Sequence, residues 1–167
     1  MILKGEHLFV TGGAAGIGEA LVIGGAKEGA KVSFVDIDDV KANALVEKLS
    51  KEGFKVQYAK ADVSKFETFK AGFDQLVSTF GPVTIAVSNA GRNSYADAVE
   101  YKEEEWNDFF ALDLKSSWYL AKLCLPDMRE KSMAQLLISH QFMVVCLGQI
   151  SFHTLPLKVE LLAYLEI

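Results

Sequence analysis

The sequence contains little cysteine, and this scarcity excludes several classes of protein. Only two of its 167 residues are cysteine, Cys124 and Cys146, and both lie among apolar residues. Isolated thiols in apolar surroundings are typical of reduced core residues in a cytoplasmic protein, and they provide neither a disulfide framework nor a pair of metal ligands. We therefore expect a cytoplasmic protein without a metal site.

An excess of basic residues and long apolar runs are also missing. The chain has 17 lysines and arginines against 22 acidic residues, a net charge of −5, which argues against nucleic acid as a partner. Residues 1–5 lack the basic and apolar regions of a signal peptide. Residues 132–157 carry no charged side chain, but the glutamines and histidines among them make this run too polar for a membrane.

Hydrophobic residues make up half of the chain, which is enough for one domain with a substantial core. Short β-rich segments alternate with segments of helical periodicity. The predicted strands are 7–10, 31–36, 55–60, 83–88 and 134–139, and the predicted helices are 17–28, 40–52, 64–80 and 106–129. This alternation predicts an α/β fold, a Rossmann-like doubly wound parallel sheet in a three-layer α/β/α arrangement.

The periodicity also predicts how the helices begin and which side chains they bury. Ser64 and Glu67 have the spacing of a capping box at the start of the third helix. The apolar side of the second helix is expected to hold Val40, Leu45, Val46 and Leu49. The apolar stripe of the last helix is expected to hold Phe110, Leu114, Trp118, Ala121, Leu125 and Met128.

The pattern weakens after residue 139. We expect residues 1–140 to form one Rossmann-like domain and residues 141–167 an atypical tail packed on it. The sheet would then end after its fifth strand or with an atypical last strand. Residues 157–167 partly alternate as a strand does, although Leu161 and Leu162 also suit a helix.

A glycine-rich turn, Val10–Gly18, succeeds the first predicted strand and opens the first predicted helix, with glycine at positions 12, 16 and 18. Amide groups at a helix start lack partners, and the helix dipole makes this end attractive to phosphate. Glycine lets a pyrophosphate approach the backbone and lets the helix pack close to the strand. Many turns contain glycines, so this turn predicts a dinucleotide site only in combination with residues later in the chain.

Three features come after the turn in the order that a dinucleotide site requires. Asp36 ends the second strand, where a carboxylate can accept hydrogen bonds from the adenosine ribose and repel a 2′-phosphate. The next two residues, Ile37 and Asp38, are not basic. The Asp62 carboxylate, after the third strand, can reach the adenine amino group. Asn89-Ala90-Gly91 lies at the end of the fourth strand, where small residues let the backbone pass the cofactor and the Asn side chain can tie adjacent strands.

Each of these features has a simpler interpretation when taken alone. Asp36 also fits a surface acid in an acidic turn, and Asp62 fits an acid at a helix N-terminus. The segment 89–91 fits an ordinary turn between a strand and a loop. Their joint occurrence behind the glycine-rich turn favours the dinucleotide site.

Together these residues resemble the short-chain dehydrogenase/reductase family over about residues 3–139. Thr11–Gly18 matches its TGxxxGxG motif, Asp36 its NAD-selecting acid, Asp62-Val63 its adenine contact and Asn89-Ala90-Gly91 its NAG motif. Pro126-Asp127-Met128 resembles the Pro-x-Met that ends the helix before its fifth strand.

The resemblance implies hydride transfer between a small alcohol or carbonyl substrate and NAD, which Asp36 makes preferred over NADP. It also implies a homodimer through the helix Trp106–Arg129. The cofactor-binding residues that it implies are Gly12, Ala15, Gly16, Ile17, Gly18, Asp36, Ile37, Asp62, Val63, Asn89, Ala90 and Gly91.

The catalytic residues of that family do not carry over. Its members use a tyrosine as acid/base with a lysine four residues on, a serine that orients the carbonyl and an asparagine in the preceding helix. Here Asp113 stands at the asparagine position, His140 stands at the serine position with Ser139 just before it, and no Tyr-x-x-x-Lys occurs. We therefore assign no catalytic residue, although His140 and His153 are candidates for a substitute acid/base.

These observations leave three alternative functions. The chain is an NAD-binding protein with impaired catalysis, an active NAD-dependent oxidoreductase with substitute residues, or a truncated or variant interaction module that dimerises with a full-length relative. We expect the first, with NAD binding and no appreciable turnover. Alternative splicing, a frameshift and divergence each explain the tail after Ser139, and the substrate is not predicted.

Overall fold

The computed structural model describes residues 1–92, 100–131 and 135–138. Five strands lie in these ranges: β1 (His7–Thr11), β2 (Lys31–Asp36), β3 (Val56–Lys60), β4 (Ile85–Ser88) and β5 (Gln135–Ile138). The helices are α1 (Gly16–Lys27), α2 (Asp39–Lys51), α3 (Phe66–Phe80), α4 (Glu103–Phe110) and α5 (Ser116–Lys131), with a π-helical segment η1 (Ala111–Lys115) between the last two.

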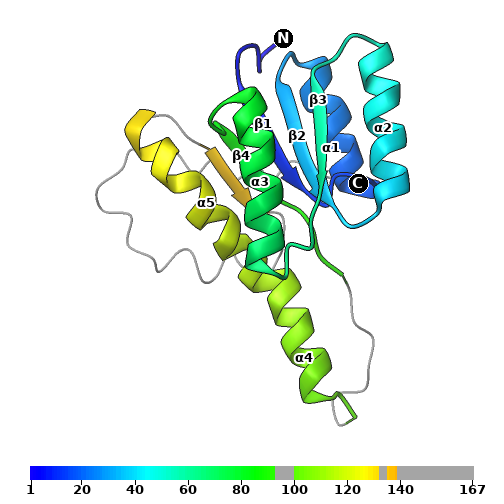
Figure 1. Ribbon diagram of the computed structural model, residues 1–167, viewed down its shortest axis with the longest axis vertical. Helices are drawn as coiled ribbons and strands as arrows, with labels where there is room; N and C mark the ends of the chain where they lie inside the picture. Colours follow the sequence, from blue (N-terminus) through cyan, green and yellow to red (C-terminus); the bar gives the residue numbers. More distant parts are fainter. Residues whose placement is uncertain (93–99, 132–134, 139–167) are drawn as a thin grey trace, which may run out of the picture.

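The strands form one parallel sheet in the order β3-β2-β1-β4-β5 (Figure 1). Adjacent residues of the central strand β1 face opposite sides of the sheet, as the period of a strand requires. Leu8 packs in a core with apolar residues of α1 and α2, and Phe9 packs in a second core with α3 and α5. These two cores make the three-layer α/β/α arrangement that the sequence predicted.

The predicted elements agree with the described ones to within a few residues at each end. β4, expected to be buried on both faces because it is almost entirely apolar, has three of its four residues buried. Of the predicted fifth strand, the described residues 135–138 form β5. Cys124 is a free, buried cysteine, as expected of a core residue.

The third helix does not begin with the predicted capping box. Its N-cap is Lys65, and no side chain caps the helix at that residue. The Ser64 hydroxyl donates instead to Oδ1 of Asp62 at 2.6 Å, and the Ser64 amide donates to the same oxygen at 3.0 Å. The neighbouring carboxylate therefore takes the hydroxyl that was expected to cap the helix.

Two predicted apolar faces are wrong in part. Val40 is 81% exposed, while Ala42, Leu45 and Leu49 form the buried face of α2. With 3.6 residues per turn, Val40 and Leu49 are about two and a half turns apart and lie on opposite sides of the helix. In α5, Met128 is buried as predicted, but Trp118 is 53% exposed, and Leu120 and Cys124, which are not on the predicted stripe, are buried. The cause is η1, because a π-helical turn holds an extra residue and rotates every later side chain relative to the count made from Phe110.

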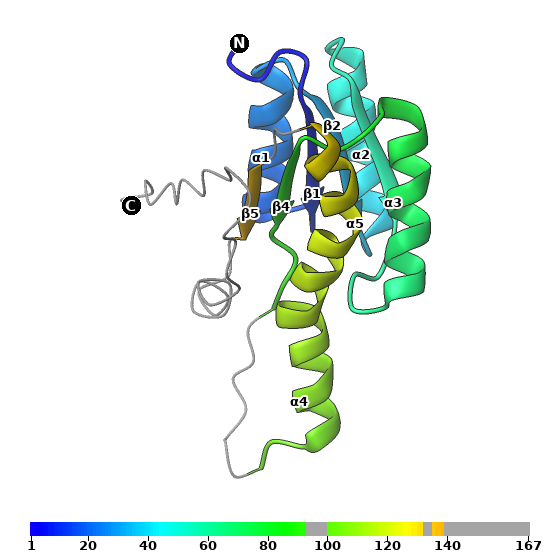
Figure 2. The ribbon, with the colours of Figure 1, turned by 90° about the vertical axis from the view of Figure 1, so that its left-hand side faces the viewer.

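Figures 1 and 2 both show α4 projecting beyond the end of the sheet, joined to the body through η1 and α5. None of the eight residues of α4 is buried. Of the helices in the described ranges, none combines the length and the apolarity needed to cross a membrane. The domain boundary at residue 140, the tail 141–167 and its expected strand, and Cys146 lie outside the described residues.

Candidate functional site

The carboxyl ends of four adjacent strands surround one cavity of about 560 Å³. In the chain, β1 leads to β2 and β3 on one side, and β4 then returns to the other side of β1. The crevice beside such a reversal of strand order is the usual ligand site of an open parallel sheet. The cavity is lined by Gly12, Ala15, Val35, Asp36, Ile37, Ala61, Asp62, Val63, Ser64, Lys65, Asn89, Ala90, Gly91, Arg92, Asp108 and Leu112.

Nine of the twelve cofactor-binding residues suggested by the sequence therefore lie together in this lining. The remaining three, Gly16, Ile17 and Gly18, belong to the first turn of α1 and do not line the cavity. The residue that precedes α1, Ala15, lines the cavity, and no side chain caps the helix there. The amide groups that open α1 thus begin beside the cavity, which suits an anionic group.

Close packing explains two of the glycines in the turn. A Cβ on Gly12, whose φ is +68°, would lie 2.9 Å from Cα of Ala90. A Cβ on Gly18 would lie 1.9 Å from the carbonyl oxygen of Gly12 and 2.6 Å from Nδ2 of Asn89. Only glycine lets α1, the turn and the end of β4 approach one another this closely.

Asp36 joins the glycine-rich turn to the start of α2. Its Oδ2 accepts the Ala14 amide and its Oδ1 accepts the Asp38 amide, each at 2.9 Å. The carboxylate lines the cavity and is partly buried. Since a carboxylate has about four acceptor positions, these two bonds leave capacity for a ligand hydroxyl.

Asp62 is held by its own neighbours. In addition to both Ser64 bonds, its Oδ2 lies 3.3 Å from Nζ of Lys65. Burial acts to raise the pKa of Asp62, but the hydrogen bonds from Ser64 and the Lys65 ammonium outweigh it, so the net pKa is below the ordinary value. Asp62 is therefore an ionised acceptor at the wall of the cavity.

The segment 89–91 is tied to the end of β1, as the sequence suggested. Nδ2 of Asn89 donates to the carbonyl oxygens of Thr11 and Gly12, at 3.1 Å each. The Thr11 hydroxyl, fully buried, accepts the amides of Asn89 and Ala90 at 3.0 Å each. The role of this hydroxyl was missed, because a threonine inside a glycine motif gives no sign of where its oxygen points.

Asp113 lies in η1, and its Oδ1 accepts the backbone amide of Arg92 at 3.0 Å. Asp113 therefore joins the helix to the segment that comes after β4, and it is not among the residues lining the cavity. Two other predicted positions, Ser139 and His140, lie outside the described residues, as does His153. Among the residues described, no group of histidines, cysteines and carboxylates has the arrangement of a metal site.

Several lining residues were not predicted. Asp108 in α4 and Leu112 in η1 both line the cavity, and their spacing of four residues is one that places two side chains on the same side of a regular helix. Ser64 and Lys65 enter because the Asp62 turn folds them back beside the carboxylate. Arg92 comes directly after the predicted segment 89–91.

Comparison with known proteins identifies the class. Residues 6–139 match the family model "short chain dehydrogenase", so the chain belongs to that family. It is 32% identical over 130 residues to a probable galactose dehydrogenase, GalD, of Rhizobium meliloti, covering 77% of this chain and 51% of that protein. It is 31% identical over 129 residues to the 5-keto-D-gluconate 5-reductase of Escherichia coli K12, with the same coverage.

A solved structure agrees with this assignment. A gluconate 5-dehydrogenase from Burkholderia cenocepacia, in complex with NADP and tartrate, superimposes with a TM-score of 0.74 at 26% identity, covering 81% of this chain and 53% of that one. Members of the family bind nicotinamide dinucleotides. The chain spans about half the length of the curated relatives it matches.

Proposed function

We propose that this chain binds NAD in the cavity at the carboxyl ends of β1 to β4. The observation that carries the proposal is the convergence in one lining of Gly12, Asp36, Asp62 and Asn89, which belong to four different strand ends. Phosphate, ribose and adenine need different partners, and this arrangement offers backbone amides and two carboxylates around one space.

The described residues fit a dinucleotide. The pyrophosphate would lie by the glycine-rich turn, where a Cβ on Gly12 would collide with Ala90 and no side chain caps α1. The ribose hydroxyls would donate to Asp36, and the adenine amino group to Asp62. A bound dinucleotide would supply or accept the hydride in any reaction of the whole protein, and the residues of this lining would hold and orient it.

Asp36 is also the basis for proposing NAD rather than NADP. Its carboxylate lines the cavity, and a 2′-phosphate on the ribose would bring two more negative charges against it. Some structural neighbours are complexes with NADP or NADPH, so the preference depends on this residue and not on the family. The scarcity of cysteine supports a cytoplasmic location as part of the same proposal.

For catalysis, we propose that these 167 residues alone do not turn over a substrate. Reduction of a carbonyl needs a proton donor positioned at the developing alkoxide. The sequence has no Tyr-x-x-x-Lys, and the Asp113 carboxylate accepts the Arg92 amide. The relatives' names make sugars and sugar acids the first alcohols and carbonyls to test for any activity of the whole protein.

Fluorescence titration with NADH and NADPH tests the binding proposal. We expect NADH to bind at least about tenfold more tightly, a difference of about 1.4 kcal/mol. Ile37→Glu places a carboxylate on an exposed residue of the lining and should weaken NADH binding, whereas Val40→Glu, on an exposed residue outside the lining, should not. Binding of neither cofactor would exclude the dinucleotide site, and a preference for NADPH would exclude the role given to Asp36.

Turnover is measured in the same preparation with NAD, NADH and a panel that includes galactose and 5-ketogluconate. We expect no rate above the background without protein. A clear rate would contradict the proposal of impaired catalysis, and His140→Ala and His153→Ala would then test the substitute acid/base.

Two exposed tryptophans support a second candidate, an interaction module. Trp106 in α4 and Trp118 in α5 are each 53% exposed. The Trp106 ring stacks on the Phe110 ring, with 4.5 Å between the ring centroids. We propose that this helical surface forms a homodimer or pairs with a full-length relative. Light scattering across a range of concentrations should give a dimer that Trp118→Glu disrupts and Val40→Glu leaves intact. A monomer at every concentration would exclude the homodimer.

A further inference from the structure

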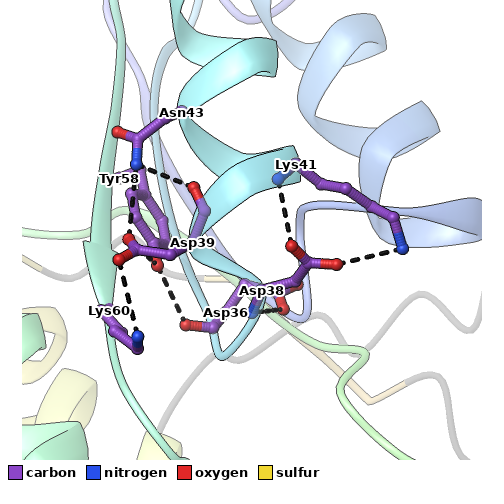
Figure 3. A network of polar contacts seen from close by, with 7 residues as sticks. All are labelled: Asp36, Asp38, Asp39, Lys41, Asn43, Tyr58 and Lys60. Atoms are coloured by element: carbon purple, nitrogen blue, oxygen red, sulfur yellow. Dashed lines mark hydrogen bonds and ion pairs between the residues drawn. The ribbon is translucent and has the colours of Figure 1, made fainter.

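Resting on the proposed NAD site, we propose that Asp38 is a second determinant of cofactor choice, which acts by holding Lys41 away from the ribose end of the cavity. Figure 3 shows the polar network that surrounds Asp36, with Asp38 and Lys41 on one side and Asp39, Tyr58 and Lys60 on the other. Asp38 is thus a positioning residue for Lys41, the nearby cation that a 2′-phosphate would otherwise attract.

The first argument is the direct link between Asp38 and Asp36. The Asp38 amide donates to Oδ1 of Asp36 at 2.9 Å, so the two residues share one tight turn between β2 and α2. Asp36 lines the cavity, and Asp38 stands two residues beyond it in sequence. Asp38 is therefore fixed close to the proposed ribose acceptor but outside the cavity lining, and it can engage a nearby cation there.

The second argument is the way Asp38 binds Lys41. Oδ2 of Asp38 lies 3.0 Å from Nζ of Lys41, and Oδ1 accepts the Lys41 amide at 3.1 Å as the N-cap of α2. The hydrogen bond and charge of Asp38 raise the pKa of Lys41, and the charge of Asp36 acts in the same direction. Lys41 is a fully charged cation within the field of Asp36, already engaged by another carboxylate.

The neighbouring lysines are paired in the same way. Nζ of Lys60 lies 3.5 Å from Oδ2 of Asp39, which also accepts the Tyr58 hydroxyl through Oδ1 at 3.0 Å. Lys65 is paired with Asp62. Lys41, Lys60 and Lys65 thus each have an aspartate partner, and Asp38 is the partner whose backbone amide also donates to Asp36.

Exposed ion pairs are weak, so a small change can release the lysine. The Lys41 side chain is 63% exposed and the Asp38 side chain 38% exposed. A 2′-phosphate carries more charge than one carboxylate and accepts charge-assisted hydrogen bonds. Once Asp38 is neutral, Lys41 can turn toward such a phosphate, and the repulsion from Asp38 disappears as well.

The test compares NADPH and NADH dissociation constants for Asp38→Asn, for Asp38→Asn combined with Lys41→Gln, and for the wild-type chain. Asparagine caps a helix about as well as aspartate, so α2 should keep its start. We expect Asp38→Asn to strengthen NADPH binding about five- to tenfold, and the added Lys41→Gln to remove most of this gain. NADH binding should change by less than about threefold, since Asp36 keeps its carboxylate.

Asp74→Asn is the matched control, because it also removes a carboxylate paired with a lysine, Lys70, but lies on α3 outside the cavity lining. Asp38→Ser supplies a second neutral N-cap if the asparagine variant folds poorly. Suppose that NADH binds, but that Asp38→Asn improves NADPH affinity no more than Asp74→Asn does. The role proposed for Asp38 is then refuted, while the proposed NAD site is not. The role of Asp38 is also refuted if Asp38→Asn improves NADPH affinity equally with and without Lys41→Gln. If neither cofactor binds, both proposals are refuted.

Discussion

Gly18→Ala is the most direct test of how the glycine-rich turn is built. The added methyl would lie 1.9 Å from the Gly12 carbonyl oxygen, a backbone atom that cannot rotate away, and 2.6 Å from Nδ2 of Asn89. Overpacking of this kind costs about 1–3 kcal/mol. Displacing Asn89 also removes its two hydrogen bonds to the end of β1, worth about 0.5–1.5 kcal/mol each.

The two effects together predict a loss of about 2–6 kcal/mol, against a total stability of about 5–15 kcal/mol for a domain. Urea unfolding measures the loss. With a denaturant slope of about 2 kcal/mol/M, a loss of about 3 kcal/mol lowers the midpoint by about 1.5 M. NADH binding should weaken in the same variant, because the Gly12 segment that lines the cavity must move.

Gly24→Ala in the same helix is the control. Gly24 is exposed, and a Cβ there would meet nothing within 4 Å. Alanine is the better helix former by about 0.5–1 kcal/mol, so this variant should be slightly more stable than the wild type. If Gly18→Ala unfolds at the same urea concentration as Gly24→Ala, the close approach of α1 to the turn is not real.

Three further predictions concern buried polar groups. Thr11→Val removes the hydroxyl that accepts two amides, and should cost about 2–4 kcal/mol in urea unfolding, whereas Thr11→Ser should retain most of the stability. Burial lowers the pKa of His7 below 6.5, and the positive charge of Lys31 lowers it further. Backbone hydrogen bonds act to raise this pKa, but the net shift is downward. The unfolded chain then binds the proton more readily, so unfolding free energies should fall as the pH drops below about 6.5, and less steeply in His7→Asn. Burial raises the pKa of Cys124, so in a Cys146→Ser background a thiol reagent should label it only after unfolding, and rapid labelling of the native chain would contradict its place in the core.

Local patterns predicted the sheet because β1 to β4 are short segments of strand-forming residues, each followed by a helix. Asp36, Asp62 and Asn89 could be placed together from the sequence alone, since the carboxyl ends of parallel strands meet at one edge of the sheet. Their bonds could not be predicted. That Asp36 holds two backbone amides, and that Ser64 turns toward Asp62, depends on loop geometry that no periodicity encodes.

The last helix shows a different limit. A count of about 3.6 residues per turn, started at Phe110, places Trp118 inside, and the structure exposes it. The five residues of η1 change the phase, and a π-helical turn has no reliable sequence signature. The exposure of Trp118 was therefore visible only in the structure, whereas a dimer through this helix was already implied by the family resemblance.

The position of β1 in the sheet has a consequence for the order of events during synthesis. β1 is made first and is buried along its whole length, yet it lies between β2 and β4. Leu8 pairs with Val32 on one side and with Ile85 on the other, so one edge of β1 stays open until Ser88 has been made. An open apolar edge is a template for aggregation, and late pairing of distant strands is slow. In the chain, α3 lies between β2 and β4, the two strands that pair with β1. Substitutions that slow the folding of α3 should therefore lower the yield of soluble protein even where the folded protein is no less stable.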